Sequence, residues 1–163
     1  MTARAASRRP PARVARQHHV RYTARSGPVV VDASIAVLWF ANEPDPWGAE
    51  GLLDGESALL APDMMAVETA NAWWKKLRRH EMGLIDIEEA VTNLIALGIT
   101  WTPSPALLRP AARLAAELGH PVYDCMYLAL AASQSALLAT ADERLRRGAE
   151  RLGLPLWSRQ TLG

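Results

Sequence analysis

Cysteine is almost absent from this sequence, since Cys125 is the only one among 163 residues. No disulfide can form within the chain, so we expect a reducing compartment and a cytoplasmic protein. Long apolar runs are also absent, although half of the residues are apolar: no run approaches the roughly 18–20 residues that span a bilayer. Residues 1–27 lack the apolar stretch of a secretory signal. We therefore expect neither export nor a membrane partner.

The net charge of +1 conceals a division of the chain into two parts. Residues 1–27 contain seven arginines and no acidic residue. Without these seven, the 18 basic and 17 acidic residues become 11 and 17, a charge of −6 for residues 28–163. The first part has no periodic apolar face, so we predict a disordered basic arm over 1–27 and one folded domain over 28–163. The arm either binds a nucleic acid electrostatically or is an upstream extension without a role.

From residue 28 onward, short apolar strands alternate with helices. The β-branched run 28–31 is typical of a strand buried on both faces. Further strands are predicted at 58–60, 99–101, 136–140 and 154–157, and helices at 34–42, 47–53, 63–79, 86–97, 104–118, 123–133 and 142–152. This alternation predicts an α/β fold with a parallel sheet covered by helices on both faces.

Four acidic residues lie on apolar elements. Asp32 and Asp142 follow predicted strands, and ligands of such folds bind at the carboxyl ends of the strands. Glu68 lies on an otherwise inward-facing helical stripe, and Asp124 opens a strongly apolar helix. If the four converge, two carboxylates about 4 Å apart repel by roughly 4 kcal/mol at an effective dielectric near 20.

A bound cation would remove this repulsion. No basic residue lies within three positions of Asp32 or Asp124, and oxygen-rich sites suit Mg²⁺ or Mn²⁺ rather than zinc. Such an ion activates water for attack on a phosphodiester. The sequence offers no convincing Ser/His or Cys/His pair as an alternative, because Cys125 should be buried and His120 precedes a proline.

Each acid also has a purely structural interpretation. Asp32 and Asp124 can complement helix N-termini. Ser34 is a suitable N-cap for the helix at 34–42, and Thr140 with Glu143 matches a capping box. These interpretations remain open at the level of sequence.

The acids lie in segments that resemble the motifs of PIN domains, specifically of VapC-type toxins from bacterial toxin–antitoxin pairs. Residues 30–34 (Val-Val-Asp-Ala-Ser) resemble the opening motif, and residues 68–71 resemble the second, a Glu followed three positions later by Asn71. Residues 123–131 resemble the third motif, and residues 139–145, with Thr-x-Asp, the fourth. The four segments occur in order and cover essentially the whole folded part.

The resemblance implies a three-layer fold with a five-stranded parallel sheet, an Mg²⁺-dependent endoribonuclease (Mn²⁺ as a substitute) and a homodimer inhibited by an antitoxin protein. It implies that the four acids hold the metal, and that Ser34, Asn71 and Thr140 support them. The family usually starts almost directly at its first strand, so the arm over 1–27 departs from its pattern.

Several other functions remain compatible with the sequence. The fold could act on DNA or in RNA maturation. A haloacid-dehalogenase-like phosphatase would need a second Asp at the position of Ser34. A non-catalytic module could bind nucleic acid through the arm and residues 75–79 (Lys-Lys-Leu-Arg-Arg). In the hairpin expected over 63–97, adjacent Trp73 and Trp74 cannot both face one core, so one should be free for a contact. We expect an antitoxin segment near Trp39 and Phe40.

Overall fold

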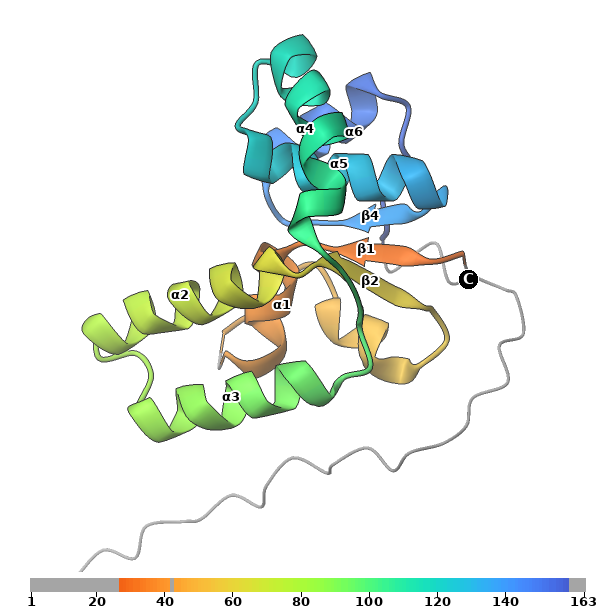
Figure 1. Ribbon diagram of the computed structural model, residues 1–163. Coiled ribbons are helices and arrows are strands. Elements are labelled where there is room, and N and C mark those ends of the chain that lie inside the picture. The colour runs from red at the N-terminus through yellow and green to blue at the C-terminus, as the bar shows by residue number, and fades with distance from the viewer. Residues whose placement is uncertain (1–26, 42, 159–163) are drawn as a thin grey trace, which may run out of the picture.

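A four-stranded parallel sheet forms the centre of the computed structural model, which describes residues 27–41 and 43–158. Its strands are β1 (Val29–Val31), β2 (Leu59–Pro62), β3 (Thr100–Thr102) and β4 (Leu137–Ala139), in the order β3-β2-β1-β4. Val29 pairs with Leu59 on one side and with Leu137 on the other. Because every pair is parallel, the carboxyl ends of the strands lie along one edge (Figure 1). Apart from Gly27, the arm predicted for residues 1–27 lies outside the described residues.

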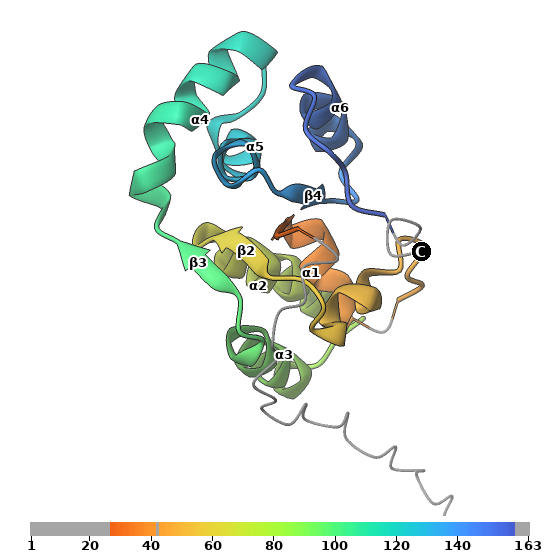
Figure 2. The same ribbon diagram turned by 90° about the vertical axis from the view of Figure 1, so that its right-hand side faces the viewer.

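Helices cover both faces of the sheet, which confirms the predicted α/β layers (Figure 2). One layer holds α1 (Ala33–Phe40), the 3-10 helix η1 (Ala49–Asp54), α2 (Met64–Arg78) and α3 (Leu84–Ala96). The other holds α4 (Ser104–Leu118), α5 (Val122–Gln134) and α6 (Glu143–Arg151). The strand order explains the division. The chain moves from β1 to β2 to β3 in one direction and then returns to β4, and right-handed crossovers place the two sets of helices on opposite faces.

The expected fifth strand is not formed as a strand in the described part of the chain. Leu154–Trp157 was predicted, but only Leu156 makes an isolated parallel bridge, to Leu138 of β4. The backbone of Leu138 donates to Pro155 and accepts from Trp157, at 2.9 Å each. Proline has no N–H to extend this ladder, so the segment contributes one bridge rather than a paired strand.

The short helix predicted at 47–53 is present as the 3-10 helix η1. Gly48 and Gly55 stand at its two ends with φ of 70° and 83°. These left-handed conformations, which glycine adopts without a steric penalty, stop a longer α-helix on both sides.

The core is centred on α5, which packs between the sheet and α4 and α6. Its residues from Cys125 to Ala131 are all buried, as are the three valines of β1. The buried thiol agrees with the expectation that Cys125 is a core residue. An element that is apolar on every side can be satisfied only between two layers, and this position fixes where Asp124, in its first turn, must lie.

Candidate active site

The predicted acids all lie at the carboxyl edge of the sheet. Asp32 follows β1 directly, and Asp142 stands three residues after the end of the neighbouring strand, β4. Glu68 reaches this edge from α2 in one layer and Asp124 from α5 in the other. The site is therefore assembled from both helical layers.

Asp32 is the most enclosed of the four acids, with 7% of its surface exposed. One of its oxygens, Oδ2, accepts hydrogen bonds from Ser34 Oγ at 2.5 Å and from Thr140 Oγ1 at 2.7 Å. Burial raises the pKa of Asp32, while the two hydroxyls and the backbone N–H groups of Ala33 and Ser34 act in the opposite direction. The carboxylate is thus fixed in place and costly to ionise.

Ser34 and Thr140 connect β1 to the loop after β4. Besides its bond to Asp32, Ser34 Oγ accepts from the backbone N–H of Ala141 at 2.9 Å. Thr140 Oγ1 accepts from the backbone N–H of Asp142 at 3.0 Å. Both hydroxyls therefore orient acids or the backbone next to them.

The capping predictions for these two residues are wrong. The N-cap of α1 is Asp32 and not Ser34, and the N-cap of α6 is Asp142 and not Thr140. The Ser34 hydroxyl is bound to Ala141 in the loop after β4, and the Thr140 hydroxyl is bound to Asp32 after β1. Each helix therefore begins at its Asp residue. Such contacts join residues more than 100 positions apart, so local spacing could not reveal them.

Glu68 is half-buried and accepts a short hydrogen bond from the hydroxyl of Tyr127 on α5. Burial raises the pKa of Glu68, Tyr127 opposes that shift, and the charges of Asp32 and Asp124 raise the pKa further. Tyr127 is a residue of the site that had not been predicted from the sequence. Its position three residues after Asp124, on the same helical face, is the signal that could have done so.

Asp124 is half-buried in the first turn of α5 and makes no capping bond there. Burial raises its pKa, as do the charges of Asp142 and Asp32, whereas Arg144 and His120 lower it. Neither basic residue lies within three positions of Asp124, so the local absence of basic residues did not exclude partial compensation from α6 and from the loop before α5.

Asp142 differs from the other acids because it is exposed and has a structural task. Its Oδ1 accepts from the backbone N–H of Leu145 at 2.8 Å, a side-chain cap on α6. Its charge reaches Asp124, but no hydrogen bond joins it to the other acids within the described residues. Asp142 therefore makes the side-chain cap that had been predicted for Thr140, whereas Asp32 makes no side-chain cap.

The donor set fits a hard divalent cation in its chemistry. Asp32, Glu68 and Asp124 supply carboxylate oxygens; burial raises the pKa of Glu68 and of Asp124, and the negative charge of Asp32 raises both further. This repulsion is what a cation such as Mg²⁺ would relieve. Across residues 27–41 and 43–158, however, no three His, Cys, Asp or Glu side chains are gathered closely enough to enclose an ion.

A family model described as PIN domain matches residues 29–151, a segment that contains all four acids. This chain belongs to the PIN-domain family. The match covers the sheet from β1 to β4 and every helix of both layers.

Relatives of this PIN domain carry the name VapC. The chain is 34% identical over 125 residues to Ribonuclease VapC3 from Pyrobaculum aerophilum, covering 72% of this chain and 91% of that protein. It is 30% identical over 117 residues to Ribonuclease VapC9 from Mycobacterium tuberculosis, covering 72% of this chain and 87% of that protein. The crystal structure of PAE2754 from Pyrobaculum aerophilum superposes with a TM-score of 0.60 at 22% identity, covering 78% of this chain and 84% of that one. This last likeness supports the fold.

Asn71, the remaining predicted site residue, does not join the acids of the PIN domain. It lies one turn beyond Glu68 on α2, is exposed, and makes no hydrogen bond to the four acids in the described structure.

The expectation for the neighbouring tryptophans is confirmed: Trp73 is fully buried and Trp74 is 46% exposed. No helix in the described part of the chain is long and apolar enough to cross a membrane.

Proposed function

We propose that this PIN domain is an Mg²⁺-dependent endoribonuclease that acts as the toxin of a toxin–antitoxin pair, with Mn²⁺ able to replace Mg²⁺. The observation that carries the proposal is the position of Asp32 beside Glu68 and Asp124 at the carboxyl edge of the sheet: burial raises the pKa of Glu68 and of Asp124, and the charge of Asp32 raises both further. The names of the relatives support RNA as the substrate.

In this proposal Asp32, Glu68, Asp124 and Asp142 hold the metal. When bound, Mg²⁺ supplies an activated water and stabilises the charge that develops on the phosphodiester. Ser34 and Thr140 fix the orientation of Asp32 through hydrogen bonds, and Tyr127 does the same for Glu68. Asp142 is positioned by its cap on α6.

A phosphatase of the haloacid-dehalogenase type is disfavoured by the surroundings of Ser34. That chemistry needs a second carboxylate two residues after Asp32, where this chain has a hydroxyl that donates to Asp32 and accepts from Ala141. A DNA nuclease would use the same acids, so the substrates must be compared directly.

The decisive experiment incubates the purified full chain with total RNA, and with matched DNA, in Mg²⁺ or in EDTA, and sequences the new ends. We expect cleavage of RNA that requires Mg²⁺ and is abolished by Asp32→Asn. Glu117→Gln is the matched control, because Glu117 is an exposed acid near the end of α4 and its substitution removes the same charge outside the site. Cleavage at an unchanged rate in EDTA would contradict the mechanism, and RNA binding without cleavage would favour the non-catalytic module.

A hollow beside α1 supports the proposed antitoxin contact. A cavity of about 540 Å³ is bounded by Trp39 and Phe40 of α1 and by Met82 and Ala90 of the α2–α3 hairpin. Acidic side chains also line it: Glu81, Asp86 and Glu89. An antitoxin segment with an apolar face and basic flanks would match this lining.

The homodimer is likewise a proposal. A monomeric mass for the intact chain at micromolar concentration, measured by light scattering, would contradict it.

A further inference from the structure

The four cations near the end of α2 are not equivalent. Lys76 forms ion pairs with Glu43 and Glu81, and Arg79 is held by both carboxylate oxygens of Glu81, at 2.7 and 3.0 Å. Lys75 and Arg78, by contrast, have no ion-pair partner within the part of the chain that the structure describes. Two positive charges are therefore left uncompensated in this segment.

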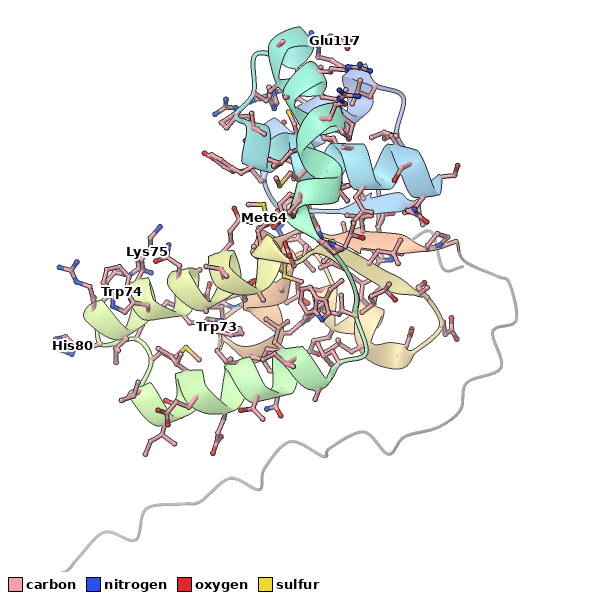
Figure 3. The ribbon with its side chains drawn as sticks, in the orientation of Figure 1. Met64, Trp73, Trp74, Lys75, His80 and Glu117 are labelled. Carbon is pink, nitrogen blue, oxygen red and sulfur yellow. The ribbon has the colours of Figure 1, made fainter. Side chains whose placement is uncertain are left out.

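These two cations lie on the exposed face of α2 that borders Glu68. Positions i, i+3, i+7 and i+10 of a helix share one side, and here they are Glu68, Asn71, Lys75 and Arg78. The opposite side carries the buried residues Met65, Thr69 and Trp73. Figure 3 shows Trp73 on the side of α2 that faces α3, and Lys75 on the other side.

Trp74 adds an aromatic surface next to Arg78. It is 46% exposed, and the guanidinium of Arg78 lies 5.3 Å from the centre of its ring. Indole and guanidinium planes both stack on nucleobases, and Lys and Arg bind the phosphates between them. An exposed tryptophan flanked by free cations is a typical surface for single-stranded nucleic acid.

We propose that Asn71, Trp74, Lys75 and Arg78, which we call the α2 track, bind the single-stranded RNA that enters the acidic site at Glu68. The proposal rests on the ribonuclease function proposed above and adds the path of its substrate. From Glu68 to Arg78 the helix rises by about 15 Å, the length of about four stacked nucleotides. The track forms a positively charged approach to the negatively charged site. Phosphates are therefore bound by Lys75 and Arg78 before they reach the acids.

RNA suits this surface better than a second copy of the chain. A symmetric interface in which the α2 track packs against the same track of a second copy would bring Lys75 and Arg78 next to the same two cations, and unpaired buried charges are costly. RNA brings a phosphate for each cation and a base for the ring. A protein interface remains one of the outcomes that the experiment can detect.

The test measures binding of a fluorescent uridine octamer to the full chain in EDTA, where cleavage cannot interfere. Lys75→Ala and Arg78→Ala should each weaken binding and lower the slope of log affinity against log salt by about 0.7, the value for one phosphate on a single strand. Trp74→Ala should weaken binding at least about five-fold, and Trp74→Phe should restore most of it. Residues 1–26 are the same in every variant, so the differences report on α2.

Arg79→Ala is the matched control. It removes the same charge as Arg78→Ala at the next position, but Arg79 is already paired with Glu81. An equal loss for Arg79→Ala and Arg78→Ala would mean diffuse attraction and would overturn the track. If Trp74→Ala changes the oligomeric mass in solution but not the affinity for RNA, the α2 track is a protein interface and the proposal is wrong.

Steady-state cleavage kinetics test the α2 track and the proposed ribonuclease function separately. The track variants should raise KM and leave kcat nearly unchanged, whereas Asp32→Asn should abolish turnover. If Asp32→Asn abolishes turnover while the track variants keep the KM of the wild type, the track is wrong and the nuclease stands. If the wild type never cleaves RNA but the track variants lose binding as expected, the track stands and the nuclease is wrong.

Discussion

Tyr127 donates a hydrogen bond to Glu68, and this bond joins the two helical layers at the carboxyl edge of the sheet. Tyr127 is 1% exposed and belongs to α5, whereas Glu68 belongs to α2. Burial, together with the negative charges of Asp32 and Glu68, raises the pKa of Tyr127, so the hydroxyl remains a donor. A tyrosine that looks like core in the sequence is thus a support for a site acid.

Tyr127→Phe should weaken the site while leaving the shape of the core intact. Since the hydroxyl lowers the pKa of Glu68, its loss should move the acidic limb of the cleavage pH profile to higher pH. The free energy of unfolding should fall by about 1.5–3 kcal/mol, the range for a hydrogen bond to a charged group. Tyr123→Phe, an exposed tyrosine on the same helix, is the control and should change neither quantity. A pH profile identical to that of the wild type would show that Tyr127 only packs.

Mg²⁺ should stabilise the folded protein through Asp32 and Asp124. A ligand that binds only the native state, at 100 times its dissociation constant, contributes about 2.7 kcal/mol. Asp32→Asn and Asp124→Ala should lose most of this gain, yet cost little stability in EDTA, because each removes a charge that repels its neighbours, and Asp32→Asn keeps an oxygen that can accept from Ser34 and Thr140. Thermal unfolding in EDTA and in excess Mg²⁺ at matched ionic strength tests this. An identical response of all three proteins to Mg²⁺ would remove the physical basis of the metal site.

Asp142 should behave differently, because its side chain caps α6. Asp142→Ala should cost about 0.5–2 kcal/mol in EDTA as well as in Mg²⁺, the usual effect of losing an N-cap. Asp142→Asn keeps an oxygen acceptor for the N–H of Leu145 and should retain most of that stability while removing the charge. If Asp142→Asn also keeps the full Mg²⁺ gain, Asp142 is a cap and not a metal ligand.

The metal-free protein should lose stability relative to Asp32→Asn as the pH rises. The pKa of Asp32 is raised above its ordinary value of 3.8, mainly by burial. The folded state therefore binds this proton more tightly than the unfolded state. The resulting stabilisation is complete below about pH 3.8 and is lost as the pH rises through the raised pKa. Urea unfolding of both proteins in EDTA from pH 4 to pH 8 measures the difference in their free energies of unfolding. Titratable groups that both proteins share cancel in this difference. A difference that stays constant with pH would contradict the assignment.

The sequence by itself determined the layers of this protein and the elements that carry its acids. The three valines of β1 and the apolar residues of α5 can be buried on all sides only in a parallel sheet covered by helices. Periodicity and composition were therefore sufficient to predict both elements. The same pattern placed Asp32 at the end of a strand, where sites of this fold class lie. The fifth strand failed because one proline, Pro155, limited the ladder to a single bridge.

Only the tertiary structure decided how the acids are held and which of them differ. The partner of Glu68 is 59 residues away, and Asp32 is bonded by Thr140, 108 residues away. Such contacts depend on which strands are neighbours, and local spacing carries no information about that. The same holds for charge: Lys75, Lys76, Arg78 and Arg79 look alike in the sequence. Packing brings Glu43 and Glu81 to Lys76 and Arg79 and leaves Lys75 and Arg78 on the face of α2 that borders Glu68.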